Sequence, residues 1–340
     1  MVGRGTAALV VGCGSIGRRH ARVLRQLGVP RIGLCDPAPA QLERAAGEVP
    51  GAETFASLDE ALGGGFAAAF VCTPPRLHVA QARQAVGAGL DVFVEKPLAV
   101  DLRGVAELEA EAAARGRRIM VGFCFRYHEG LRRVKRMIDD GRIGRLVAIR
   151  AALGEDLSIA RPGVDYRTLY VTAADVGVTL DLLHEPDFAR WIAASPVASV
   201  CAMTGTRSDL EMLGDDTADM LIRFESGVVA NVHLDFFQRR RRRESEYLGT
   251  QGTVVLDMTS WERSLISSYR VGEADWTVET LAMERDDMFR AMDGEFLRGI
   301  ATREPPANGL HEGVASLQIA LAARRSSSLE RHVKVAEISA

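Results

Sequence analysis

The 340-residue sequence has no long hydrophobic run and no large excess of either charge. No stretch reaches about 18 apolar residues, the length at which a membrane-spanning helix becomes possible. The apolar run that precedes residue 12 is too short for a secretory signal. The formal net charge of −3 gives no general attraction to nucleic acid or to an anionic membrane. We therefore expect a cytoplasmic protein that binds neither.

Paired cysteines and clustered metal ligands are also missing. The five cysteines are an odd number, show no C-x-x-C pair and lie mostly in apolar runs, so we expect reduced core residues. His20, His78 and His233 stand alone, without the spacing of metal ligands. The sequence therefore predicts no metal site.

No proline-rich linker and no internal repeat divides the chain, although its length suffices for two domains. Up to about residue 124, short apolar runs alternate with helical patterns, which predicts a parallel sheet. The expected strands are 7–11, 31–36, 66–72, 91–95 and 119–123, and the expected helices are 15–27, 39–49, 77–88 and 101–115. Longer strands follow at 146–153, 217–224, 228–237 and 244–248. We predict an α/β domain over 1–124 and an α+β domain over 125–340.

A glycine-rich turn joins the first expected strand to the first expected helix. Gly12 permits a tight turn, Gly14 lets backbone approach a pyrophosphate, and Gly17 allows close packing of the helix. The N–H groups of Ser15 and Ile16 would begin the helix and face the anion. The segment therefore predicts a dinucleotide-binding turn.

Asp36 strengthens this reading because it ends the second expected strand, nineteen residues after Gly17. A carboxylate there can accept hydrogen bonds from a ribose diol and would repel a 2′-phosphate, which favours NAD over NADP. Arg31 or Arg44 could still help to hold a phosphate. The alternative is a glycine-rich loop with a capping aspartate.

Several short motifs follow in a fixed order: the glycine turn, Thr73-Pro74-Pro75 with His78, Glu95-Lys96-Pro97, and Asp181 with His184 and Asp187. Together they resemble the Gfo/Idh/MocA oxidoreductases, typified by glucose-fructose oxidoreductase and inositol dehydrogenases. The resemblance covers essentially the whole chain. It implies a Rossmann domain followed by an open-faced, mainly antiparallel sheet that binds substrate and forms a homodimer or homotetramer. It also implies cofactor contacts by Thr73, Pro74, His78, Glu95 and Lys96.

Lys96 directly follows an expected strand, where a doubly wound sheet places its ligands. The resemblance implies that its amine bonds a substrate hydroxyl and helps to remove the proton as hydride leaves the carbon. Pro97 would fix the turn that aims the amine. The alternative is a solvated surface lysine.

Residues 179–192 have apolar positions at helical intervals, which would place Asp181, His184 and Asp187 on one surface. His184 is the expected base, because its unperturbed pKa lies near neutral pH. Many family members carry the acid four residues before this histidine, where this chain has Leu180, so the resemblance implies a catalytic role for Asp181. The alternative is a structural helix.

Substrate binding is expected from arginines and tyrosines, which can grip anions and stack on a sugar ring. These candidates are Arg126, Arg161, Tyr166, Arg167 and Tyr170, four of them in one loop that could instead be folded by its own side chains. The arginine run 239–243 continues a strand, so alternate side chains should face opposite sides. A solvated sheet face or an oligomer interface explains that run better than nucleic acid does.

These features predict an NAD(P)-dependent dehydrogenase that acts on a sugar, nucleotide sugar or cyclitol. Two alternatives are an NAD-dependent glycosidase of the same fold and a non-catalytic NAD-binding sensor. The sequence does not choose the substrate, the direction of hydride transfer, or dimer against tetramer.

Overall fold

The computed structural model describes residues 6–339, whose contacts divide them into two compact units. The first unit contains the chain up to Cys124 and also Asp286–Ala315, and the second contains Phe125–Arg285 and Ser316–Ser339. The predicted division at 124/125 coincides with the first change of unit, but the predicted second domain also included 286–315. Residues 1–5, where the first domain was predicted to begin, lie outside the described residues.

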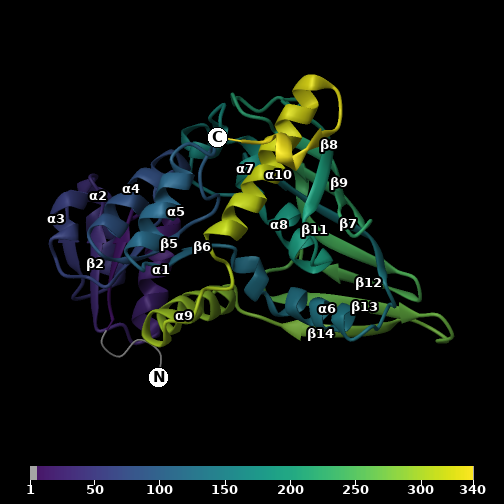
Figure 1. Cartoon of the computed structure of the whole chain (residues 1–340), viewed down its shortest axis with the longest axis horizontal. Coiled ribbons are helices and arrows are strands. Elements are labelled where there is room, and N and C mark those ends of the chain that lie inside the picture. The colour runs from purple at the N-terminus through teal and green to yellow at the C-terminus, as the bar shows by residue number, and fades with distance from the viewer. Residues whose placement is uncertain (1–5, 340) are drawn as a thin grey trace. The chain divides into compact units, whose positions relative to one another are not determined.

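The first unit contains a six-stranded parallel sheet in the order β3-β2-β1-β4-β5-β6 (Figure 1). Its strands are short and, apart from β3, consist mainly of buried residues, as in a sheet covered on both faces. This is the doubly wound order in which ligands bind outside the carboxyl ends of the strands. The strands are β1 Ala7–Val11, β2 Arg31–Cys35, β3 Glu53–Phe55, β4 Ala68–Val71, β5 Asp91–Val94 and β6 Ile119–Val121.

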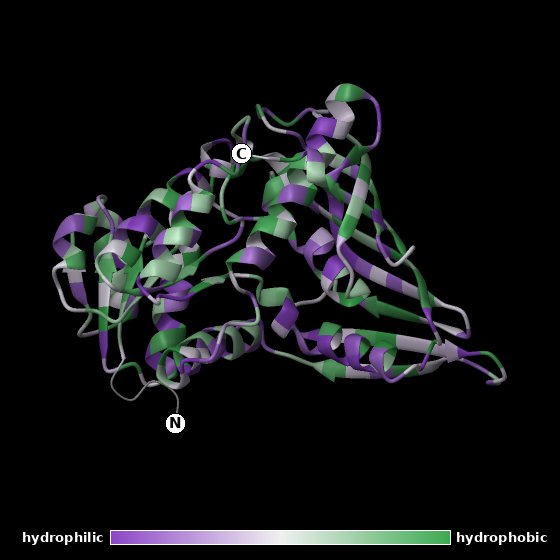
Figure 2. Cartoon of the chain, viewed as in Figure 1, coloured by the Kyte–Doolittle hydropathy of each residue, from purple (hydrophilic) through white to green (hydrophobic). Residues whose placement is uncertain are grey.

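Helices cover this sheet with apolar faces. Hydrophobic and hydrophilic residues both occur along these helices (Figure 2), and α1 buries one face through His20, Ala21, Val23 and Leu24. They are α1 Ser15–Gln26, α2 Pro39–Glu48, α3 Leu58–Leu62, α4 Pro75–Gly87 and α5 Val105–Ala114. A late segment, α9 Asp287–Thr302, packs against α1 in the same unit.

The second unit contains a nine-stranded sheet in the order β14-β13-β12-β11-β7-β10-β9-β8-β15. Only β7 and β10 pair in parallel, and the other neighbours are antiparallel. The strands are β7 Leu146–Asp156, β8 Val197–Gly205, β9 Thr217–Phe224, β10 Val229–Asp235, β11 Phe237–Gly249, β12 Gly252–Asp257, β13 Arg263–Arg270, β14 Thr277–Ala282 and β15 Val333–Lys334. The predicted combination of a Rossmann sheet and a mainly antiparallel sheet is confirmed.

Buried and exposed residues alternate along β9 from Ala218 onward, as expected for a sheet with one covered face. The covering helices are α6 Glu129–Asp139, α7 Gly177–Asp181, α8 His184–Ala193 and the later part of α10 Leu310–Leu329. Short 3-10 turns are η1 Cys124–Tyr127, η2 Tyr166–Thr168, η3 Tyr170–Thr172 and η4 Val335–Glu337.

The helix expected over 179–192 is broken. The chain leaves helical geometry at Leu182, and α8 begins at His184. Pro186 explains the break, because proline fits the first turn of a helix but would clash with the carbonyl four residues earlier in a helix interior. Asp181 and His184 therefore lie on two different helices.

Candidate active site

The glycine turn has the geometry expected of a backbone cradle. Gly12 has φ +91°, and a Cβ there would lie 2.9 Å from the carbonyl of Cys72. A Cβ at Gly17 would collide with the carbonyl oxygen of Gly12, whereas one at Gly14 would meet nothing within 4 Å. The first turn of α1 carries no acidic residue. Gly14 and Ser15 therefore present open backbone at a helix N-terminus that favours an anion.

Asp36 follows β2 and closes one side of this turn. Its Oδ2 accepts the N–H of Cys13 at 2.8 Å, and its Oδ1 accepts the N–H of Ala38 at 2.9 Å. The carboxylate is thereby held beside the glycine turn on a partly exposed residue. Arg31, considered as a phosphate ligand, instead forms a forked pair with Glu53 at 2.6 and 2.8 Å.

His78 supports the loops that follow β4 and β5. It is buried, with Nδ1 2.9 Å from the carbonyl oxygen of Pro97 and Nε2 2.7 Å from that of Thr73. Burial lowers the pKa of His78. The ring lies between the two loops, and its single N–H in the neutral form donates to one of these carbonyls. The cofactor contact expected of His78 stays a prediction. Pro74, at the start of α4, is exposed.

Lys96 follows β5 and is half-buried. The carboxylate before it is fixed, since Glu95 Oε2 accepts the backbone N–H of Lys96 at 3.0 Å and Oε1 lies 2.9 Å from His20 Nε2. Strands β1, β4 and β5 are neighbours and parallel. Their carboxyl ends therefore bring Gly12, Thr73 and Lys96 to one edge of the sheet.

In the second unit, Tyr170 and Asp181 are brought together. The hydroxyl of Tyr170 donates to Asp181 Oδ1 at 2.7 Å. His184 lies near the start of α8 with its ring centroid 4.8 Å from that of Phe125. The structure thus places an acid, a phenol and an imidazole on neighbouring segments of one unit.

Arg126 is less available than predicted. Its guanidinium donates to both oxygens of Asp187, at 2.9 and 2.6 Å, and both side chains are buried. Asp187 also accepts the hydroxyl of Ser316 at 2.6 Å. The pair fastens η1 and α10 to α8, so its evident role is to position that helix.

The loop 161–170 is partly folded by its own side chains. Arg167 forms a forked pair with Asp165 at 2.9 Å, and the hydroxyl of Tyr166 accepts the N–H of Glu211 at 3.0 Å. The Arg161 side chain is exposed and acts electrostatically on Glu155. The structure therefore supports the self-folded alternative for part of this loop, and the substrate contacts stay a prediction.

Sequence reasoning missed a group beside these residues. Burial and Asp181 raise the pKa of Glu155 against the opposing effects of Arg241, Arg243 and Arg161. Burial and nearby arginines lower the pKa of Arg241 to about 10, and its guanidinium lies 4.4 Å from the centre of the Trp261 ring.

The predicted alternation of the arginine run holds only over its second part, because Arg239 and Arg240 are both exposed and the pairing of β11 with β7 is irregular between residues 237 and 242. Arg243 is buried and its Nε donates to Glu185 Oε1 at 2.6 Å, whereas Arg242 is exposed and pairs with Glu244. Arg239 pairs with Asp156. The alternation was the one available signal that part of this run faces inward.

Among residues 6–339, no three His, Cys, Asp or Glu side chains are grouped to hold a metal ion. Within the same range, every helix is too short or too polar to cross a membrane.

Nicotinamide dinucleotide fits the first unit. The Gly14 backbone is open where a Cβ would meet no atom, the helix start lacks acids, and Asp36 stands beside the turn. Gly12, Gly14, Ser15, Ile16 and Gly17 would hold the pyrophosphate, and the cofactor would supply a hydride acceptor.

Comparison with known families agrees with this geometry. Residues 7–123 match the family described as "Oxidoreductase family, NAD-binding Rossmann fold". Residues 131–255 match the "GFO/IDH/MocA C-terminal domain". The two matches together cover more than half of the chain.

Relatives and solved structures extend the agreement over nearly the full length. The chain is 30% identical to an inositol 2-dehydrogenase of Burkholderia cenocepacia, over 88% of this chain and 97% of the relative. Its fold is similar to that of myo-inositol 2-dehydrogenase from Lactobacillus plantarum (TM-score 0.84, 23% identity, 97% and 99% of the two chains). It is also similar to levoglucosan dehydrogenase in complex with NADH (TM-score 0.86, 20% identity, 97% and 99%). The chain belongs to the Gfo/Idh/MocA family and is an NAD(P)-dependent oxidoreductase.

Proposed function

We propose that the protein is an NAD-dependent dehydrogenase that oxidises a ring hydroxyl of a cyclitol or sugar. In this reaction the carbinol carbon loses a hydride to the cofactor, the hydroxyl proton passes to a basic group of the protein, and a ketone remains. Relatives named as inositol 2-dehydrogenases support a cyclitol as the first substrate to examine.

The observation that carries this proposal is the placement of Lys96. Its half-buried side chain follows β5, on the sheet edge that also carries the glycine turn. The cofactor-binding residues and an amine are thus held by one rigid sheet. The amine of Lys96 would bond the substrate hydroxyl and stabilise negative charge that develops on its oxygen.

The second unit would contribute the proton acceptor and the sugar contacts. We assign the general base to His184, with Asp181 as the acid of the same segment, held by Tyr170. Arg161, Tyr166 and Arg167 are the proposed substrate contacts, and Arg126 is proposed to act by holding Asp187 and therefore α8.

NAD is the proposed cofactor in preference to NADP. The carboxylate of Asp36 is held beside the glycine turn by two backbone N–H groups, where it would accept hydrogen bonds from a ribose diol. Arg31 is occupied by Glu53, so this arginine is not poised for a 2′-phosphate.

We further propose a cytoplasmic homodimer or homotetramer. The five cysteines form no disulfide in the structure, as in a reducing compartment. The open sheet face carries exposed apolar residues at Met203, Leu221 and Val229, which a second copy could cover. Size-exclusion chromatography with light scattering checks the assembly.

Spectrophotometry with a substrate panel tests the function. Purified protein with NAD is offered inositols, free hexoses, amino sugars and nucleotide sugars, and the absorbance band of reduced nicotinamide is followed. A rise with one class that disappears in Lys96→Met supports the proposal. Sugar release without net reduction would favour a glycosidase, and tight NAD binding without any turnover would favour a sensor.

A further inference from the structure

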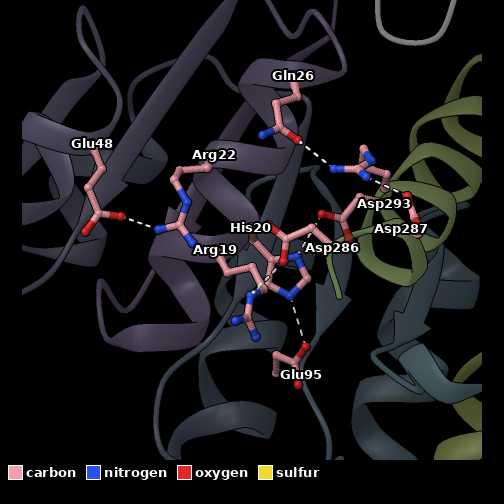
Figure 3. A network of polar contacts seen from close by, with 10 residues as sticks. Arg19, His20, Arg22, Gln26, Glu48, Glu95, Asp286, Asp287 and Asp293 are labelled. Atoms are coloured by element: carbon pink, nitrogen blue, oxygen red, sulfur yellow. Dashed lines mark hydrogen bonds and ion pairs between the residues drawn. The ribbon is translucent and has the colours of Figure 1, made fainter. Parts of the chain in front are cut away.

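A buried histidine connects three distant parts of the first unit. His20 lies on α1 with no exposed surface, and Figure 3 shows its ring between Glu95 and Asp293. Nε2 is 2.9 Å from Glu95 Oε1, and Nδ1 is 2.8 Å from Asp293 Oδ2. Asp293 comes from α9, so the two bonds join residues far apart in the sequence.

The surroundings of His20 favour the doubly protonated ring. An ionised carboxylate only accepts hydrogen bonds, so two carboxylate partners require an N–H on both ring nitrogens. Burial lowers the pKa of His20, but the charges and hydrogen bonds of Asp293 and Glu95 outweigh it and raise the pKa to about 10. The rings of Phe93 and Phe289 pack around the imidazole, with centroids 5.0 and 5.6 Å away.

Glu95 transmits this arrangement to the next residue. While Oε1 faces His20, Oε2 accepts the backbone N–H of Lys96 at 3.0 Å. The carboxylate also lies against the backbone of Gly122, so close that a Cβ at this position would be only 2.9 Å from Oε1. Both oxygens of Glu95 are therefore fixed, and one of them determines where the Lys96 backbone sits.

We propose that His20 is a positioning residue for Lys96: held by Asp293, it fixes Glu95, and Glu95 fixes the backbone that carries the amine. The inference rests on the proposed role of Lys96 in turnover. The proposal gives α9 a supporting role, because its Asp293 holds His20. It also gives Glu95 the role of fixing the backbone position of Lys96.

The chain contains only three lysines, Lys96, Lys135 and Lys334, which makes Lys96 directly observable. Reductive ¹³C-methylation followed by NMR gives one resolved environment per lysine, and Lys96→Met identifies the signal of interest. Lys334 is exposed and serves as an internal reference. This readout needs no turnover, so it decides the inference even if the proposed function fails.

His20→Gln is the principal variant, and Phe289→Leu is its matched control. The first removes the charge and one of the two bonds, whereas the second disturbs the packing around the same ring and leaves both bonds. We expect His20→Gln to move the Lys96 signal toward that of Lys334 and to lower kcat at least tenfold, with the Kd for NAD within about threefold. Phe289→Leu should lower Tm but should leave the Lys96 signal and kcat unchanged.

A second variant covers the case in which His20→Gln does not fold. Gly122→Ala places a methyl group against Glu95 Oε1 and should shift the Lys96 signal without removing any charge. An unchanged Lys96 signal in the folded variants would overturn the proposal. So would equal loss of kcat in His20→Gln and Phe289→Leu at matched loss of Tm. Absence of wild-type turnover would count against the proposed function alone.

Discussion

The two units hold their candidate residues in different ways. In the first, backbone groups and strand ends define the site: Gly14 offers open main chain, and N–H groups hold Asp36. In the second, side chains from separate elements hold one another, as in the buried pairs Arg126–Asp187 and Arg243–Glu185. The glycine turn of the first unit thus depends on local geometry, whereas the second unit, like the His20 cluster behind Lys96, depends on charge pairing between distant residues.

The largest expected effect concerns the amine at the sheet edge. Lys96→Met should lower kcat by about 10²- to 10⁴-fold, because it removes a group that assists proton transfer and stabilises charge. NAD affinity should stay within about threefold, since the glycine turn is untouched. Steady-state kinetics and fluorescence titration of NAD measure the two quantities, and an unchanged kcat would remove Lys96 from the mechanism.

The second prediction tests charge pairing in the second unit. Arg243→Met leaves Glu185 buried without its guanidinium and should cost about 3–5 kcal/mol of unfolding free energy. Arg242→Ala, its exposed neighbour on β11, should change stability by about 0.5 kcal/mol or less. Urea denaturation of both variants measures the two losses of unfolding free energy. Similar losses in both variants would show that the buried pair contributes no more than an exposed one, and would remove the charge pairing by which the second unit was distinguished.

A third prediction concerns pH and the buried charge cluster of His20, Glu95 and Asp293 in the first unit. The pKa of His20 is raised to about 10, so its stabilisation is complete below the unfolded value near 6.5 and is lost as pH rises through 10. The charged groups that act on it are Glu95 after β5 and Asp293 on α9. These two carboxylates also act on the thiol of Cys72 after β4, and Asp286 acts on Asp293.

Relative to His20→Gln, wild-type stability should therefore fall by about 1 kcal/mol per pH unit between pH 7 and 10. Denaturant unfolding across this range measures the slope. Parallel curves for the two proteins would show that the ring is not charged in the folded state.

The smallest predicted effect concerns cofactor choice. Asp36→Ala should weaken NAD by about 10- to 150-fold, because a hydrogen bond from a ribose diol to a carboxylate is worth about 1.5–3 kcal/mol. NADP should be weakened less or bind more tightly, since the negative charge beside a 2′-phosphate is removed. Isothermal titration with both cofactors measures this difference, and equal losses would contradict a ribose contact.

Local motifs made the first unit readable from the sequence. Gly12, Gly17 and Asp36 act through the turn and strand that contain them, and alternating strands and helices indicate the parallel sheet. The return of α9 to this unit was not predictable, because the contact between His20 and Asp293 spans 273 residues without any periodic pattern.

The second unit was harder to read for the same physical reason. Glu155 and Arg241 acquire their environment from neighbouring strands and loops, which single-sequence patterns do not reveal. The break before His184 did have a signal, since Pro186 restricts where a helix can begin. Strands β12, β13 and β14 were missed. Each of them pairs in antiparallel register with the strand before it, and this pairing is not visible in composition.

Isotope transfer tests the central claim most directly. Inositols and sugars carrying deuterium on their carbinol carbons are incubated with the protein and NAD, and the reduced cofactor is examined by mass spectrometry. The account predicts one deuterium atom in the reduced cofactor for one substrate class, formed at least about 10²-fold more slowly by Lys96→Met. Reduced cofactor without deuterium, or deuterium transfer at an unchanged rate in Lys96→Met, would contradict it.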